Sequence, residues 1–216
     1  MKNMSIAIKK IRRNYQDFGL RVAFTKGVQY ILKRIYANRT YRIYRRDLSN
    51  GQWPQLSPDG IVFKIVQSKD TEAIRQIEDM EEWLHGMLPE TITNGLCVAA
   101  FDGTQVVGFN LVAFQKVFIS LLNMRKRLNP YQAWSEQITV LKAYRKQGLA
   151  SALRYHVFSE LAQRGIRALY GGALVSNIAS LKLAEKVGFR FIADVQYRKF
   201  LNREHRIWRV IRHGGR

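Results

Sequence analysis

The stretch VLKAYRKQGLASAL, residues 140–153, indicates the fold more strongly than any other part of this chain. A β-rich segment, Trp134–Leu141, runs into a basic turn, and the turn opens a helix that we expect over Gln147–Arg164. The first N–H groups of a helix have no acceptor within it, and the helix dipole is positive at that end. Gly148 lets the backbone come close to a ligand, and Arg145 adds positive charge. The turn therefore predicts a pyrophosphate site.

Strands and helices alternate on both sides of this stretch. Before it, we expect a strand, a helix and a hairpin, at Ile61–Val66, Asp70–Trp83, and Leu96–Phe101 with Gln105–Phe114. After it, we expect a strand, a short helix and two β-rich segments, at Ala168–Val175, Asn177–Val187, Phe189–Phe200 and Arg206–Ile211. This order predicts an α/β fold with at least one right-handed parallel crossover.

The charge of the chain is strongly positive and unevenly placed. Its 36 Lys and Arg against 16 Asp and Glu give +20, and residues 1–46 carry +12 of this, from 13 cations and one acid, Asp17. Such a field attracts anionic partners, such as phospholipid head groups, nucleic acid or phosphorylated ligands, without choosing among them. No run approaches the ~20 apolar residues of a membrane span, because Lys or Arg interrupts every candidate. We therefore expect that the protein does not cross a bilayer, and the single cysteine, Cys97, is compatible with a cytoplasmic location.

A turn-rich stretch, Ser49–Gly60, predicts a boundary between two parts of the chain. Four apolar residues before it have the spacing of one helical face, namely Val28, Ile31, Leu32 and Ile35. We expect a basic amphipathic helical extension at 1–50 and an α/β domain at 51–216. The extension either lies on the anionic inner face of a membrane or packs on its own domain.

A second stretch, NIASLKLAEKVGF at residues 177–189, adds to the first. Together they resemble the two signatures of the GNAT superfamily of acyl-CoA-dependent N-acetyltransferases, the first of which is Arg/Gln-x-x-Gly-x-Gly/Ala. The resemblance covers roughly Ile61–Ile211. It implies a mixed, mostly antiparallel central sheet flanked by helices, acetyl-CoA as acyl donor, and direct transfer to an amine. The acceptor amine is then that of an amino sugar, a lipid-linked intermediate, a polyamine or a protein.

The resemblance also implies which residues bind the coenzyme. The pyrophosphate is assigned to the loop and helix start, namely Arg145, Lys146, Gln147, Gly148, Leu149, Ala150 and Ser151. The thioester carbonyl is assigned to the backbone of the preceding strand, namely Ile138, Thr139, Val140 and Leu141. Asn177 and Ser180 lie where the second signature passes the pantetheine arm, although a helix N-cap explains Asn177 equally well.

Glu136 is the candidate general base. Strand alternation places it on the face of Ile138 and Val140, and the alternative is a structural Glu paired with a nearby cation. Family members often have a Tyr acid before Glu-Lys-Val-Gly-Phe, but Ala184 stands there. Tyr197 is the candidate replacement, with a packing role as the alternative.

The histidines and the single cysteine, Cys97, show no metal-ligand spacing, so no metal site is expected. A function of another class, nucleic-acid binding by a catalytically silent GNAT-like fold, would also suit the basic segment 1–46. No recognised nucleic-acid motif accompanies that charge. Coenzyme binding would distinguish the enzyme from this alternative.

Overall fold

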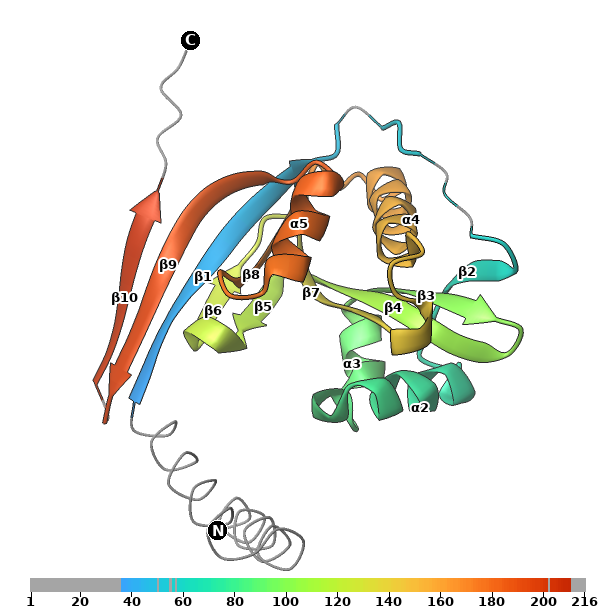
Figure 1. Ribbon diagram of the computed structural model, residues 1–216, viewed down its shortest axis with the longest axis horizontal. Coiled ribbons are helices and arrows are strands. Elements are labelled where there is room, and N and C mark those ends of the chain that lie inside the picture. The colour runs from blue at the N-terminus through green and yellow to red at the C-terminus, as the bar shows by residue number, and fades with distance from the viewer. Residues whose placement is uncertain (1–35, 50, 55, 57, 202, 211–216) are drawn as a thin grey trace, which may run out of the picture. The chain divides into compact units, whose positions relative to one another are not determined.

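The computed structural model describes residues 36–49, 51–54, 56, 58–201 and 203–210 (Figure 1). Contacts divide the chain into two compact units. One unit comprises residues 1–40 with 196–208, and the other comprises residues 41–195 with 209–216. The second unit holds most of the described helices and strands.

The main sheet has the strand order β10-β9-β1-β8-β7-β4-β3-β2. Its strands are β1 (Tyr36–Asp47), β2 (Ile61–Ile65), β3 (Gly95–Asp102), β4 (Gln105–Phe114), β7 (Gln132–Val140), β8 (Ala168–Leu174), β9 (Arg190–Phe200) and β10 (Arg203–Val210). The pairs β1–β8, β2–β3, β3–β4 and β4–β7 are antiparallel, whereas β7 and β8 are parallel. This confirms the predicted mixed, mostly antiparallel sheet.

The helices of the described residues are α2 (Thr71–Met80), α3 (Leu88–Thr93), α4 (Leu149–Gln163) and α5 (Ile178–Lys186). Helix α4 connects the two parallel strands, as the predicted crossover requires. The stretch after β4 forms a small two-stranded sheet from β5 (Lys116–Ile119) and β6 (Met124–Arg127). No helix in the described part of the chain is long and apolar enough to cross a membrane.

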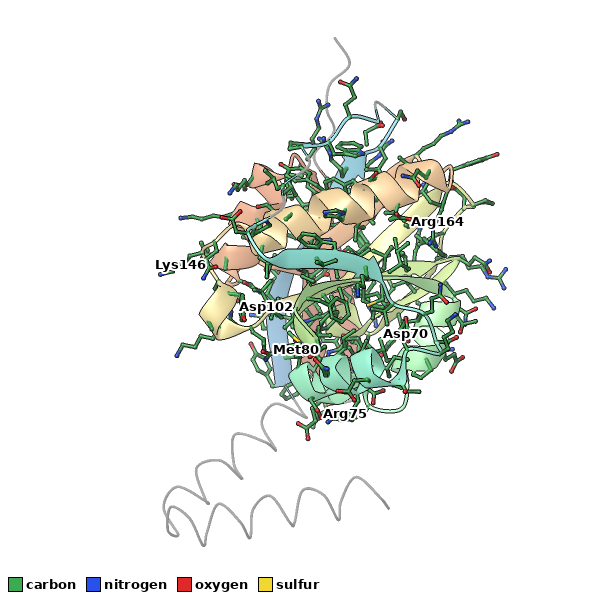
Figure 2. The ribbon with its side chains drawn as sticks, turned by 90° about the vertical axis from the view of Figure 1, so that its right-hand side faces the viewer. Asp70, Arg75, Met80, Asp102, Lys146 and Arg164 are labelled. Carbon is green, nitrogen blue, oxygen red and sulfur yellow. The ribbon has the colours of Figure 1, made fainter. Side chains whose placement is uncertain are left out.

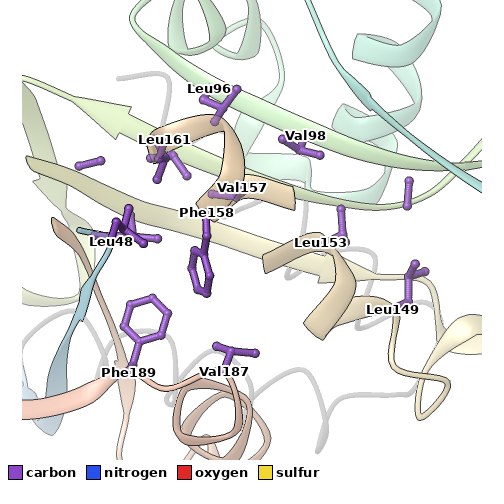
Figure 3. Close-up of a cluster of buried hydrophobic side chains, with 14 of the residues drawn as sticks. Leu48, Leu96, Val98, Leu149, Leu153, Val157, Phe158, Leu161, Val187 and Phe189 are labelled. Carbon is purple, nitrogen blue, oxygen red and sulfur yellow. The ribbon is translucent and has the colours of Figure 1, made fainter. Parts of the chain in front are cut away.

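Two clusters of buried side chains cover the two faces of the sheet. Helix α4 packs on one face through residues such as Leu153 and Val157 (Figure 3). Helices α2 and α3 pack on the other face, where Ile74 and Ile77 meet the hairpin of β3 and β4. Cys97 lies fully buried in this second cluster, and burial raises the pKa of its thiol to about 12. It therefore acts as a small apolar residue, as expected.

Strand β1 is the largest departure from the predicted organisation. Residues 41–47 pair with β8, from Tyr41 opposite Leu174 to Asp47 opposite Ala168, although the prediction assigned them to the extension. Tyr41 and Ile43 are buried and the intervening Arg42 is not, which is the period of two that a strand requires. Residues 1–35, with the predicted amphipathic helix, lie outside the described residues. The sheet therefore begins before the predicted boundary at residue 50.

Candidate active site

The turn between β7 and α4 presents a row of backbone N–H groups. It consists of a 3-10 turn, η3 (Lys142–Tyr144), and the four residues before α4. Lys146 and Gly148 have positive φ angles of 65° and 83°, which turn the backbone sharply into the helix. Among the described residues, the N–H groups of residues 146–150 find no backbone acceptor. Five consecutive donors at the positive end of a 15-residue helix form a site suited to pyrophosphate.

Three side-chain contacts hold this loop in place. The Nε atom of Arg145 donates to the carbonyl of Val140 at 2.9 Å, and the Tyr144 hydroxyl donates to Asp102 at 2.7 Å. Gln147 donates to the carbonyl of Ala143 at 3.0 Å, within the turn. Figure 2 shows Lys146 at the beginning of α4 and Arg164 at its opposite end. The loop is therefore anchored to β7 and to the β3–β4 hairpin.

Strands β7 and β8 pair only at their beginnings. The ladder joins Gln132–Trp134 to Ala168–Tyr170, and in the described structure it continues no further. On its other edge β8 pairs with β1, and β7 pairs with β4 along nearly its whole length. The two strands therefore part after Trp134, and the backbone of residues 135–140 faces the gap on that edge. N–H groups at such a gap can stabilise a developing oxyanion.

A β-bulge lies at Glu136. On β4, Val112 pairs with Ser135 and Leu111 pairs with Gln137, so Glu136 is the extra residue. A bulge of this kind bends the strand and increases its twist, which helps to part β7 from β8.

The bulge also interrupts the strict alternation of side chains between Ser135 and Ile138 on β7. Ser135 contacts helix α4, and Ile138 belongs to the cluster on the same helix, although three positions separate them. Strict alternation would put residues three apart on opposite faces. The extra residue accounts for the change of register.

A cavity of about 960 Å³ opens where the two strands part. Its walls include Ser135–Ile138 of β7, Gly171–Leu174 of β8, and Leu183 and Ala184 of α5. The volume lies within the range of small-molecule sites. Ala184, which stands where the family often has a Tyr acid, lines this cavity and offers no proton.

Glu136 lines the cavity and is half-buried. Burial raises the pKa of its carboxyl group above the ordinary value, with no charged neighbour contributing to the shift. The ion pair that would make Glu136 merely structural is absent from the described part of the chain. A carboxylate with a raised pKa beside a cavity is suited to accept a proton from a substrate.

Sequence reasoning missed a buried polar group on the α4 side of the cavity. Arg154 donates through Nη1 to Oδ1 of Asn110 at 3.1 Å and to Oγ of Ser135. Asn110 in turn donates to the carbonyl of Gln137 at 2.8 Å. Asn110 is fully buried in β4 and Ser135 is 6% exposed. The sequence signal for this buried group is Asn110, a polar residue within the mostly apolar β4, because a buried polar side chain needs a hydrogen-bond partner.

The remaining predicted coenzyme residues occupy different places. Ile138, Asn177 and Ser180 line the cavity, and Asn177 also accepts a hydrogen bond from the N–H of Ser180 at 3.2 Å as the N-cap of α5. Thr139 donates to Glu81 at 2.6 Å, on the α2 side of β7. Leu141 donates its N–H to the carbonyl of Val107 at 2.9 Å, so that N–H is not available to a thioester.

Tyr197 belongs to the first unit, whereas the residues that line the cavity belong to the second. It is 3% exposed, and the guanidinium carbons of Arg39 and Arg206 lie 4.9 and 5.6 Å from its ring centroid. Burial and a hydrogen bond with Glu204 raise the pKa of its hydroxyl. These contacts account for a packing role, and its part in catalysis stays a prediction.

The order of elements and the loop at the start of α4 agree with the fold that the two sequence signatures imply. The model of the acetyltransferase (GNAT) family matches residues 63–189, more than half of the chain. The chain therefore belongs to the GNAT family, which confirms the resemblance found in the two signatures.

Solved structures show the same fold. A GCN5-related N-acetyltransferase from Sphaerobacter thermophilus is 18% identical, with a TM-score of 0.57 over 87% of this chain and 58% of that one. A GNAT-family acetyltransferase from Novosphingobium aromaticivorans is 18% identical, with a TM-score of 0.51 over 73% of this chain and 62% of that one. The chain thus spans about three fifths of the length of these structures. No curated protein sequence matches it.

Proposed function

We propose that this protein transfers an acyl group, ordinarily acetyl, from acyl-CoA directly to an amine. The observation that carries the proposal is the arrangement of the second unit, in which an N–H cradle precedes α4 and a cavity with Glu136 opens where β7 and β8 part. Family membership supports acyl-CoA as the donor. The described residues include no metal-binding cluster, and the proposed transfer uses none.

The residues of this chain bind the coenzyme, polarise the thioester carbonyl and accept a proton from the amine. Acetyl-CoA supplies the acyl group as a thioester. The N–H groups of residues 146–150 bind the pyrophosphate, and the open backbone edge of β7 donates hydrogen bonds to the carbonyl oxygen as it becomes negative. Glu136 accepts a proton from the attacking amine. The thiolate of coenzyme A leaves and takes up a proton from solvent.

The opening of the cavity favours an acceptor with an apolar part. Trp83, Met87 and Phe118 all line it, yet they are 49%, 55% and 52% exposed. Large apolar side chains gathered at one exposed site usually meet a ligand or a partner. This supports an amine carried by a lipid-linked molecule, such as a lipid-linked amino sugar, over a polyamine.

The central experiment measures acetyl-CoA binding by the full-length protein and then screens amines by mass spectrometry. We expect acetyl-CoA to raise the melting temperature, because a ligand at 100 times its Kd stabilises by about 2.7 kcal/mol. Among amines matched in the reacting group, those with an alkyl chain should react faster. Salt-sensitive nucleic-acid binding without any coenzyme binding would instead support the silent alternative.

The basic N-terminal segment supports a peripheral location on an anionic membrane. Each engaged cation contributes about 1 kcal/mol near such a surface. Changing Lys9, Lys10, Arg12 and Arg13 together to Gln in the full chain should weaken sedimentation with anionic vesicles while leaving acetyl-CoA affinity unchanged. If the unaltered protein ignores anionic vesicles at low salt, the membrane proposal is wrong.

A further inference from the structure

Arg154 is a cation set into the wall of the cavity. It belongs to α4 and lines the space between β7 and β8, so part of the residue is accessible from the cavity. Its guanidinium is otherwise enclosed, and Nε is buried with no hydrogen-bond partner in the described structure. Among its nitrogens, only Nη1 donates to described residues, to the neutral Asn110 and Ser135, and the guanidinium carbon lies 5.6 Å from the ring centroid of Phe189.

The described residues provide no carboxylate to balance this charge. Burial lowers the pKa of Arg154 to about 10, and no acidic group acts on it in the opposite direction. Glu136 lines the same cavity, but the shift in its pKa likewise has burial as its sole cause. A buried cation without a counter-charge destabilises a protein unless a partner is supplied. A substrate bound in the cavity is well placed to supply one.

The edge of Arg154 that makes no hydrogen bond consists of Nη2 and the buried Nε. Neither Nε nor Nη2 donates to a described residue, and these two atoms form the side of the guanidinium that binds carboxylates in a bidentate manner. The same chain shows that arrangement elsewhere. Arg42 donates through Nε and Nη2 to the two oxygens of Asp194, at 2.8 and 2.9 Å.

From this geometry we infer that Arg154 binds a carboxylate group of a substrate in the cavity, so that the enzyme prefers substrates that bear one. The inference rests on the proposed function, because it concerns the same site. The carboxylate belongs either to the acyl group, as in a dicarboxylic acyl-CoA, or to the amine acceptor, as in an amino acid. Ser135 and Asn110 hold the guanidinium in position through Nη1, and Nη2, which makes no hydrogen bond to a described residue and is not among the buried atoms, is left for the substrate.

The test has two arms, which separate these sources. In the first, calorimetry compares the Kd values of acetyl-CoA, malonyl-CoA and succinyl-CoA for the full-length protein. In the second, kcat/KM is compared for amines of equal length with and without a carboxylate, such as 4-aminobutanoate and butylamine. Binding of coenzyme A itself, which carries no acyl group, is measured in parallel as the control for the phosphate loop, residues 145–150 before and at the start of α4.

We expect the carboxylate-bearing member to be favoured at least about tenfold in one arm, since a hydrogen bond to a charged group commonly contributes that much. Arg154→Gln, which keeps donors for Asn110 and Ser135 but removes the charge, should abolish the preference. Arg164→Met is the matched control, because it removes the same charge from the exposed far end of α4, and it should leave the preference intact.

Each outcome either supports or overturns the binding of a carboxylate by Arg154. If coenzyme A binds and neither arm shows a preference, the inference is overturned while the proposed function stands. The same holds if the preference persists in Arg154→Gln or disappears equally in Arg164→Met. If the unaltered protein binds no coenzyme, the proposed function fails and the inference fails with it. Should Arg154→Gln not fold, Arg154→Lys serves instead, because a point charge without the planar fork should weaken the preference.

Discussion

Replacing Gly148 by Glu should abolish coenzyme binding while leaving the protein folded. Gly148 has a φ of +83° and stands directly before α4, where the unpaired N–H groups gather. A Cβ atom at this position would meet no protein atom within 4 Å, so the side chain projects into open space. With acetyl-CoA bound, that space should hold the pyrophosphate, and a carboxylate there adds both bulk and like charge.

The cost to stability can be separated from the cost to binding by a matched variant. Gly165, at the other end of α4, has a φ of +76°, and a Cβ atom there would likewise meet no protein atom within 4 Å. Either glycine replaced by Glu adopts a left-handed conformation that costs about 1–2 kcal/mol, or roughly 2–8 °C in melting temperature. Gly148→Glu and Gly165→Glu should therefore be destabilised alike.

Only Gly148→Glu should lose affinity for acetyl-CoA. Juxtaposing like charges costs several kcal/mol, so a weakening of at least about 100-fold is expected. Calorimetry measures the Kd directly, and thermal unfolding with and without acetyl-CoA gives an independent value. If folded Gly148→Glu binds acetyl-CoA within a few-fold of the unaltered protein, the pyrophosphate does not bind at this loop.

Three further changes test the base, the acid and the packing of β8. Glu136→Gln should lower kcat about 10²- to 10⁴-fold with little change in coenzyme affinity. In the unaltered protein, burial raises the pKa of Glu136, so kcat should fall with decreasing pH at a higher pH than it would with an ordinary Glu. If the variant loses less than a few-fold in kcat at every pH, Glu136 is structural. If Tyr197 is the acid, Tyr197→Phe should lower kcat, because the phenylalanine has no hydroxyl proton to donate. An unchanged kcat would leave Tyr197 a packing residue. Gly172→Ala should destabilise by about 1–3 kcal/mol in denaturant unfolding, because its methyl group would clash with the ring of Tyr41, whereas Gly171→Ala, whose nearest neighbour would be 3.4 Å away, should be tolerated; equal effects would contradict this packing.

The phosphate loop could be predicted from the sequence because its structure is local. The strand, the turn and the helix start are consecutive, and Gly148 adopts the positive φ that its residue type favours. The helix cap of Asn177 was predictable for the same reason, since its hydrogen-bond partner is three residues away. Features of this kind are encoded within one short stretch.

The bulge, the first strand and the buried arginine depend on partners far away in the sequence. Whether Glu136 pairs or bulges is decided by the register of β4 against β7. The strand at residues 41–47 needs β8, and its Arg and Tyr residues also suit a basic amphipathic extension. Arg154 gives no local sign that Asn110 and Ser135 would enclose it. Such features follow from pairing between distant segments, which one sequence does not specify.

The place of β1 in the sheet has a consequence for the synthesis of the protein. Asp47 pairs with Ala168, which lies 168 − 47 = 121 positions later in the chain. At about 5–20 residues per second, the ribosome needs on the order of 10 s to make that partner. During this time Tyr41 and Ile43, both buried in the finished fold, are exposed on the nascent chain. Arg42 and Arg45 interrupt the apolar run and should act as gatekeepers against aggregation while the strand waits.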